Sequence, residues 1–313
     1  MTILENHEVL RKNNAGLATL MALISGGIAP AAIWQQKKYR LKYLFRTFLA
    51  PRQTLRYLNI LTRHQYFSTL LSAQKTLPSK IHRHYLHLGL NTASRVDAIT
   101  YHYEFIDRLC GQHLGQALLS AEKTPLIHLT GKDGEAVIVS ASSAGGAERE
   151  GECTLWLEVE GTPLASVTFC ATHSQQQQAI VIGGLQGARR NVPHEAIKMA
   201  TKACYGLFPK RLLMETLWLL AERQNIKIIY GVSDRSHVFR GLRYRMSKSK
   251  KFHASYNEFW GSIGGVKYNE HLFLLPLSLE RKDINIIASK KRSEYRKRYA
   301  LLNVLRDKFN QLR

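Results

Sequence analysis

The chain has 313 residues, with 45 Lys and Arg against 23 Asp and Glu, so its formal net charge at pH 7 is +22. Apolar residues make up 45% and charged residues 22%, which excludes a disordered chain and predicts a folded protein with a real core. The positive charge favours a polyanionic partner. It does not distinguish nucleic acid, an anionic lipid surface and a phosphate-bearing cofactor.

The four cysteines are far apart and form no CxxC pair, which argues against a structural zinc site and favours a reducing compartment. They are Cys110, Cys153, Cys170 and Cys204. The histidine-rich segment 80–87 has no Asp, Glu or Cys beside it, and its basic setting repels cations, so we interpret its histidines as solvated or structural. We therefore expect no metal site and a cytoplasmic location.

Residues 13–36 carry no charge and are long enough to span a bilayer, but Gly16, Ser25-Gly26-Gly27 and Pro30 interrupt the run. Three interpretations remain: a spanning helix, contact with a membrane surface, or buried helices of a soluble protein. The next segment, 37–46, alternates basic residues with aromatic residues and leucines.

On a helix through this segment, Leu41, Phe45 and Phe48 share one face, while basic side chains share another. This pattern is typical of an interfacial helix whose cations meet anionic headgroups. It fits equally well a helix with a buried apolar face and a solvated basic face. The basic residues are Lys38, Lys42 and Arg46.

The pattern along the chain predicts an α/β (α+β) fold in two parts, with a helical region at 1–120 and an α/β region at 121–313. From Pro125, short β-branched and aromatic runs between Gly, Asp and Pro turns indicate an antiparallel meander. A βαβ unit follows, with strands at 179–182 and 226–232 that we expect to pair in parallel. A last strand at 271–275 and a long helix from Ser289 complete the fold.

The predicted site lies at the carboxyl ends of the two parallel strands, where such folds place their ligands. The first strand leads into an apparent glycine-rich turn followed by two arginines, whose backbone N–H groups and charges suit a phosphate. The alternative is a tight strand exit with solvated arginines. The candidate cofactor-binding residues are Gly183, Gly184, Gln186, Gly187, Arg189 and Arg190.

The second strand ends beside Ser233 and His237, which we predict as catalytic groups that move protons. Asp234 or Ser236 would serve equally well as the N-cap of a following helix. A dense basic segment comes next, and it suits an anionic ligand or substrate. It carries no nucleic-acid-reading module, so we expect no sequence-specific nucleic-acid binding. The anion-binding candidates in it are Arg240, Arg243, Tyr244 and Arg245.

Several motifs together resemble the VirK/YbjX family of enterobacterial virulence-associated proteins. The family implies a cytoplasmic protein, either free or peripheral on the inner membrane, linked to cell-envelope stress and to tolerance of antimicrobial peptides. It implies no established catalytic residues. The matching pieces are 77–83, 182–187, 231–233, His237-Val238, 243–245, Phe259-Trp260 and 289–296.

The order of elements also resembles GNAT-type N-acyltransferases, in which acyl-CoA phosphates sit on the loop after the first of two diverging parallel strands. That resemblance implies acyl or aminoacyl transfer from a thioester donor such as acyl-CoA to a small-molecule or peptide amine. The segment 186–190 departs from the usual loop pattern, and an extra helix intervenes. One alternative is a non-catalytic adaptor on an anionic membrane surface or a protein partner. A third interpretation is a non-specific nucleic-acid binder, and the oligomeric state stays open.

Overall fold

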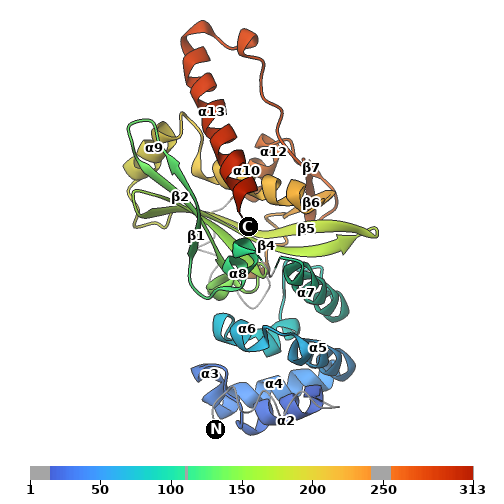
Figure 1. The fold of residues 1–313 in the computed structure, drawn as a ribbon. Coiled ribbons are helices and arrows are strands. Elements are labelled where there is room, and N and C mark those ends of the chain that lie inside the picture. The colour runs from blue at the N-terminus through green and yellow to red at the C-terminus, as the bar shows by residue number, and fades with distance from the viewer. Residues whose placement is uncertain (1–14, 110–111, 241–254, 313) are drawn as a thin grey trace.

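An eight-stranded mixed sheet lies at the centre of the computed structural model, which describes residues 15–109, 112–240 and 255–312 (Figure 1). The strand order across the sheet is β1-β2-β3-β4-β5-β6-β8-β7. The strands are β1 (Thr124–Thr130), β2 (Ala136–Ser143), β3 (Cys153–Val159), β4 (Thr162–Ser174), β5 (Gln177–Gly187), β6 (Ile228–Val232), β7 (Val266–Lys267) and β8 (Leu272–Leu275).

The pairing confirms the predicted meander and the predicted parallel pair. Strands β1 to β5 are antiparallel neighbours in chain order. Strands β5 and β6 are parallel, from Ala179 opposite Ile228 to Ile182 opposite Gly231. Strand β8 then pairs with β6 in the antiparallel direction and carries β7 on its outer edge. The carboxyl end of β6 therefore faces the middle of β5, where the site was predicted.

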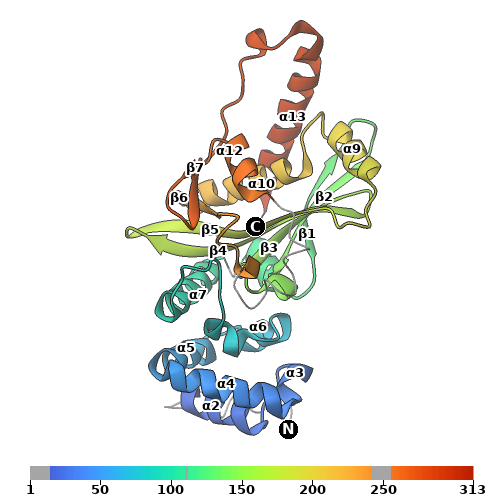
Figure 2. The ribbon, with the colours of Figure 1, turned by 180° about the vertical axis from the view of Figure 1, so that it is seen from behind.

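Helices cover both faces of the sheet (Figures 1 and 2). One face is covered by α7 (Thr92–Asp107) and α8 (His113–Leu119), and the other by α10 (Pro209–Arg223) and α13 (Ser289–Gln311). Helix α10 is apolar almost all round because it lies between the sheet and α13, which confirms its predicted burial. The shorter helices α9 (His194–Ala203) and α12 (Tyr256–Ser262) lie at the margins of this second layer.

The remaining helices form an N-terminal arm that extends away from the sheet beyond α7 (Figure 1). The arm comprises α2 (Ala15–Ser25), α3 (Ala32–Gln35), α4 (Lys37–Leu49), α5 (Pro51–Arg63), α6 (Phe67–Ala73) and the 3₁₀ helix η1 (Leu77–His82). The charge-free run is broken between Ser25 and Ala32, as its glycines and proline predicted. Within the described residues, no helix combines the length and apolarity that crossing a membrane requires.

Two groups of buried apolar side chains hold these layers together. The larger core includes residues from Tyr57 on α5 to Phe309 on α13 and so joins the inner part of the arm to the sheet. The smaller core lies within the arm, among α2, α3, α4 and α5, with Trp34 and Tyr43 at its centre. The division into two domains near residue 120 stays a prediction.

Candidate functional site

The segment from Gly183 to Gly187 is a strand, so the predicted glycine turn is wrong. Strand β5 continues to Gly187 and pairs with β4, with Gly184 opposite Thr168 and Gly187 opposite Ala165. The register between the two strands shifts at Gly183, as in a β-bulge. The partner β6 ends at Val232, so β5 runs on beyond it and the two parallel strands separate at the bulge.

The two glycines at the bulge leave room for a neighbouring acidic residue. A Cβ on Gly183 would overlap the backbone carbonyl of Glu150, and a Cβ on Gly184 would overlap its carboxylate. Glycine is therefore required here by the close approach of Glu150 rather than by the bend of a turn. The sequence analysis singled out these glycines but attributed the wrong local structure to them.

Glu150 links the glycines of β5 to the predicted catalytic histidine. His237 is fully buried, and its Nε2 lies 3.1 Å from Oε1 of Glu150, which is also buried. The Tyr256 hydroxyl lies beside them and accepts hydrogen bonds from the Leu185 backbone N–H (3.3 Å) and from Nε2 of Gln186 (2.8 Å). These side chains form a strand-end cluster, defined here as Glu150, Gln186, His237 and Tyr256.

The strand-end cluster pairs an imidazole with a carboxylate, the combination that orients a histidine for proton transfer. Ser233 is not part of it. Its hydroxyl donates to the carbonyl of Glu270 (2.9 Å), while Ser236 contacts Nδ1 of His271 (2.7 Å). The structure thus brings His237 to the glycine strand and gives Ser233 a different partner.

Asp234, which follows β6, connects the end of that strand to the start of α12. Its carboxylate accepts hydrogen bonds from the backbone N–H groups of Tyr256 (2.7 Å) and Asn257 (3.2 Å) at the start of α12. Asp234 thus binds the first N–H groups of α12 from more than 20 residues away in the chain, whereas the N-cap residue of that helix is Ser255. In this way Asp234 holds the backbone of Tyr256, while Leu185 and Gln186 of β5 hold its hydroxyl.

The predicted phosphate-binding arginines lie at the open end of β5. Arg189 and Arg190 follow the strand and are exposed, and Arg240 at the end of η3 (Val238–Arg240) is also exposed. The other anion-binding candidates, Arg243, Tyr244 and Arg245, lie outside the described residues. Of the six cofactor-binding candidates, Gln186 is held by Tyr256 and Gly187 faces a pocket.

That pocket lies between the end of β5, the start of α10 and α12, and its volume is about 470 Å³. Apolar side chains from three helices form most of its wall, and Lys210 is the cation that borders Gly187. Burial lowers the pKa of the Lys210 amine. Neither Ser233 nor His237 is among the described residues that line it. The lining residues are Leu164, Gly187, Ala188, Ile197, Phe208, Pro209, Lys210, Arg211, Phe259, Ser262 and Ile263.

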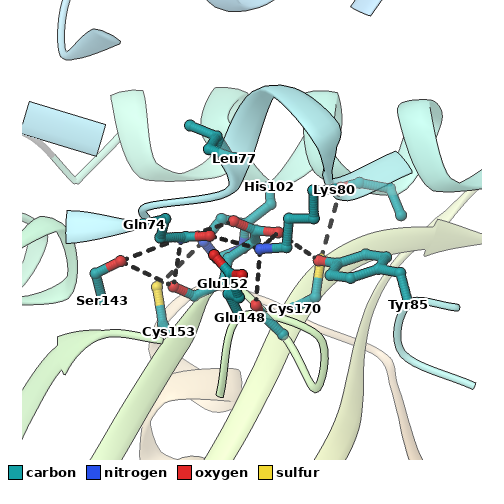
Figure 3. A network of polar contacts seen from close by, with 12 residues as sticks. Gln74, Leu77, Lys80, Tyr85, His102, Ser143, Glu148, Glu152, Cys153 and Cys170 are labelled. Carbon is teal, nitrogen blue, oxygen red and sulfur yellow. Dashed lines mark hydrogen bonds and ion pairs between the residues drawn. The ribbon is translucent and has the colours of Figure 1, made fainter. Parts of the chain in front are cut away.

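A second buried cluster, which the sequence analysis missed, joins the N-terminal arm to the sheet (Figure 3). The Lys80 amine lies 2.5 Å from Oε1 of Glu152, and both side chains are fully buried. Tyr85 (2.7 Å), Tyr103 (2.6 Å) and Gln74 (2.9 Å) also donate to the Glu152 carboxylate. Burial alone would raise the pKa of Glu152, but Lys80 and His102 outweigh it and hold that pKa below its ordinary value.

The acidic residues of both clusters come from one loop, residues 148–152, in an otherwise basic chain. Glu150 pairs with His237, which follows β6. Glu152 turns toward Lys80 on η1 (Figure 3). The third acid of the loop, Glu148, pairs with Arg83 (3.3 Å). A signal was present in the sequence, because three acids within five residues are unusual in this chain. Their partners could not be read from it, since these lie about 65 to 90 residues away.

His102 extends the second cluster onto β3 and β4. Its Nδ1 accepts from the Ala171 backbone N–H (3.1 Å), so its Nε2 carries the proton and donates to Sγ of Cys153 (3.1 Å). Burial lowers the pKa of His102 to about 4, and it lowers those of His82 and His87 to about 4 as well. His82 and His87 are thus neutral structural groups, whereas His84 is exposed. Within the described residues no cluster could hold a metal ion.

Comparisons with known proteins agree with the resemblance found in the sequence. Residues 32–311 match the family model described as "Protein of unknown function (DUF535)". The chain is 38% identical to the uncharacterized protein YbjX of Escherichia coli K12 over 292 residues, which cover 93% of this chain and 88% of YbjX. It is 27% identical to an uncharacterized protein of Haemophilus influenzae, over 89% of this chain and 91% of that protein.

No solved structure matches the chain. The family match spans the arm from α3 onward, the sheet and α13, so it covers both buried clusters and the strand ends. The chain therefore belongs to the DUF535 family, the VirK/YbjX family that its motifs indicated.

Proposed function

We propose that this protein binds the anionic surface of a membrane from one side, through helix α4 of the N-terminal arm. The observation that supports the proposal is the orientation of α4. Its inward face consists of Tyr43 and Thr47, which are buried. Leu41, Phe45 and Phe48 form the row of apolar residues that the sequence predicted to face either the core or a membrane. This row points away from the protein, with Phe45 65% and Phe48 72% exposed. We call this row, with Leu49, the apolar face of α4.

The position of α4 suits contact with a flat surface. The helix lies at the end of the arm that is farthest from the sheet, beside α2, which exposes Leu17 and Met21 (Figures 1 and 2). Exposed aromatic and aliphatic side chains in a row on an amphipathic helix are typical of segments that enter the boundary between headgroups and acyl chains. Each such side chain contributes at most about 1.5–3 kcal/mol when it is fully buried.

The charge of the arm complements an anionic surface. The sequence contains no Asp or Glu between Glu8 and Asp97, while Lys and Arg occur throughout that interval. On α4, Lys37, Lys38 and Lys42 are exposed beside the apolar face. Each basic residue close to an anionic leaflet adds about 1 kcal/mol, an amount that salt reduces. An apolar partner alone would not account for this exclusion of acids.

Family membership suggests what the attachment is for. The VirK/YbjX resemblance implies a role in envelope stress and in tolerance of antimicrobial peptides, which act on anionic membranes. A protein that attaches to the cytoplasmic face of the inner membrane would be located where that damage is sensed or repaired. In this proposal the protein is cytoplasmic and peripheral, and high salt releases much of it from membranes.

Cosedimentation with vesicles tests the proposal. The wild type should bind vesicles that contain phosphatidylglycerol and should bind pure phosphatidylcholine vesicles weakly. Phe45→Ser with Phe48→Ser should weaken binding roughly 100-fold, because burial of two phenyl rings contributes about 3 kcal/mol or more. Ile286→Ser is the matched control, since Ile286 is 75% exposed and lies three residues before α13, which covers the face of the sheet opposite the arm. Equal binding by the phenylalanine variant and the control would contradict the proposal.

A second candidate function, acyl or aminoacyl transfer to an amine, rests on a different observation. Strands β5 and β6 diverge at the Gly183 bulge, and a largely apolar pocket opens at the end of β5. This arrangement agrees with the GNAT-type order of elements. In this proposal the pocket holds the apolar arm of a thioester donor such as acyl-CoA. The His237–Glu150 pair is buried and does not line the pocket, so it takes no direct part in the transfer. A mass-spectrometric search for a copurifying thioester or acyl chain tests it, and a protein purified without either would count against it.

A further inference from the structure

A second groove, of about 710 Å³, lies beside the pocket at the end of β5, between α9 and the first turns of α13. Residues spaced three and four apart on each helix face it, which places one face of each helix on opposite walls. From α9 and the segment after it come His194, Ile197, Lys198, Thr201, Lys202, Tyr205, Gly206 and Phe208; from α13 come Lys290, Ser293, Glu294 and Lys297; and Lys132 comes from the β1–β2 turn.

Five lysines line this groove, and few described acidic side chains lie close enough to neutralise their charges. Its one acid, Glu294, is bound by Arg298 (3.0 Å). Of the five amines, only that of Lys198 has a carboxylate of a described residue within 4 Å, at 3.5 Å from Glu195. Like charges that converge on one concave surface without acidic partners cost free energy unless an anion binds there. The lysines are Lys132, Lys198, Lys202, Lys290 and Lys297.

The groove has fixed walls because α13 is fastened to the end of α9. Nε of Arg298 donates to the carbonyl of Tyr205 (2.8 Å), and the same guanidinium holds Glu294. Gly206 has a φ of +78°, and a Cβ there would lie 2.5 Å from both Glu294 and Arg298. The backbone at Lys132 is bound to the end of α9, since its N–H donates to the carbonyl of Ala203 (2.9 Å).

The groove and the pocket at the end of β5 form one continuous surface, because Ile197 and Phe208 line both. One end of this surface is mainly apolar and the other is basic. We propose that it binds a soluble amphiphile that carries several phosphates, with the phosphates on the lysines of the groove and the apolar part in the pocket. An acyl coenzyme A is one such molecule. Binding in the groove does not require acyl transfer, but it shares its pocket with the second candidate function, and the preference for a soluble ligand rests on the proposed attachment through α4.

The position of the groove favours a soluble ligand over a membrane lipid. The groove lies on the α10–α13 side of the sheet, whereas the apolar face of α4 lies at the far end of the arm on the other side (Figure 1). A protein that rests on a bilayer through α4 would therefore hold the groove away from that bilayer. When the protein is attached through α4, the phosphates of a lipid that stays in the bilayer cannot reach the lysines of the groove. Only a ligand dissolved in water can reach them.

Isothermal titration with palmitoyl coenzyme A, and separately with free coenzyme A and with palmitate, tests the inference. The acylated probe should bind most tightly because it fills both parts. Lys198→Gln, Lys202→Gln and Lys297→Gln combined should weaken its binding about 100-fold or more, since each charge-assisted bond lost costs about tenfold. The control combines Lys37→Gln, Lys38→Gln and Lys42→Gln, which removes the same charge from α4 and should change this binding less than twofold.

The two triple variants and the three probes distinguish specific binding in the groove from its alternatives. Equal weakening by both triple variants would show unspecific attraction to a basic protein and would overturn the inference, as would no binding of any probe by the wild type. Loss of phosphatidylglycerol-vesicle binding in the groove variant, with palmitoyl coenzyme A binding intact, would assign the groove to membrane lipid and would also overturn it. The α4 variant is expected to lose vesicle binding only, so failure of the membrane proposal would be seen separately.

Discussion

Replacement of Lys80 by Met should destabilise the protein more than any change of a surface charge. The substitution preserves most of the side-chain volume but leaves the Glu152 carboxylate buried with only neutral donors. It also removes the amine that donates to Oε1 of Gln74 (2.6 Å) and to the carbonyl of Gly151 (3.1 Å). Breaking a fully buried ion pair costs about 3–5 kcal/mol. That is a large part of the ~5–15 kcal/mol by which proteins of this kind are stable.

The cost of Lys80→Met should also depend on pH. In the wild type the folded pKa of Glu152 is lowered, so its contribution to stability is present above the ordinary value of 4.5 and is lost only as the pH falls below it. Without Lys80, the largest influence that lowers this pKa is gone and burial raises it. The variant should then be relatively more stable at pH 5 than at pH 8, because a protonated Glu152 carries no charge to bury.

Urea unfolding at pH 5, 7 and 8 measures both effects. Arg56→Met is the matched control, since Arg56 pairs with Asp97 (2.7 Å) on the surface, where an ion pair contributes about 0–1 kcal/mol. The double variant Lys80→Met with Glu152→Gln should lose less stability than the sum of the single variants, because neither charge is stranded. A loss of less than about 1 kcal/mol for Lys80→Met at pH 8, or a loss that grows as the pH falls, would refute this reasoning.

Three further outcomes follow from the buried groups. Gly184→Val should displace Glu150 from His237 and lower the unfolding midpoint, whereas a glycine in an open turn would tolerate valine, and a thermal melt distinguishes the two. Stability should fall as the pH drops from about 6.5 toward 4, because His102 stays neutral when folded with a pKa of about 4, and a His102→Gln variant should show a shallower fall in urea titrations. In a Cys110→Ser background, Ellman's reagent should modify no thiol until the protein unfolds, because burial raises the pKa of each described cysteine.

Local pattern was sufficient to predict most of the fold. The helix predicted from Ser289 begins there, since its apolar residues recur every three or four positions and four apolar side chains of the helix are buried against the core. The parallel pair was predictable because 179–182 and 226–232 are short apolar runs separated by helical segments. These features depend on residues that are close in the sequence, and the periodicity of such residues predicts local structure.

Features that depend on distant residues could not be predicted in the same way. The glycines at 183 and 184 resemble a turn in the sequence, and only the approach of Glu150 explains why the strand continues through them. The pairing of Lys80 with Glu152 joins residues 72 positions apart, and the sequence gives no distance between them. For α4 the sequence allowed the face with Phe45 and Phe48 to be either buried or exposed. That face is exposed because the opposite side of the helix packs inward through Tyr43, whose ring centroid lies 5.1 Å from that of Trp34.

The central claim is that the apolar face of α4 enters a membrane surface, and a fluorescent probe on that face tests it most directly. In a Cys110→Ser background, Phe45→Cys and Ile286→Cys would each be labelled with an environment-sensitive dye and mixed with phosphatidylglycerol vesicles. We predict that the emission from position 45 shifts to the blue and is quenched by lipid-borne quenchers, while the emission from position 286 does not change. Unchanged emission from position 45 on vesicles that carry the protein would contradict the account.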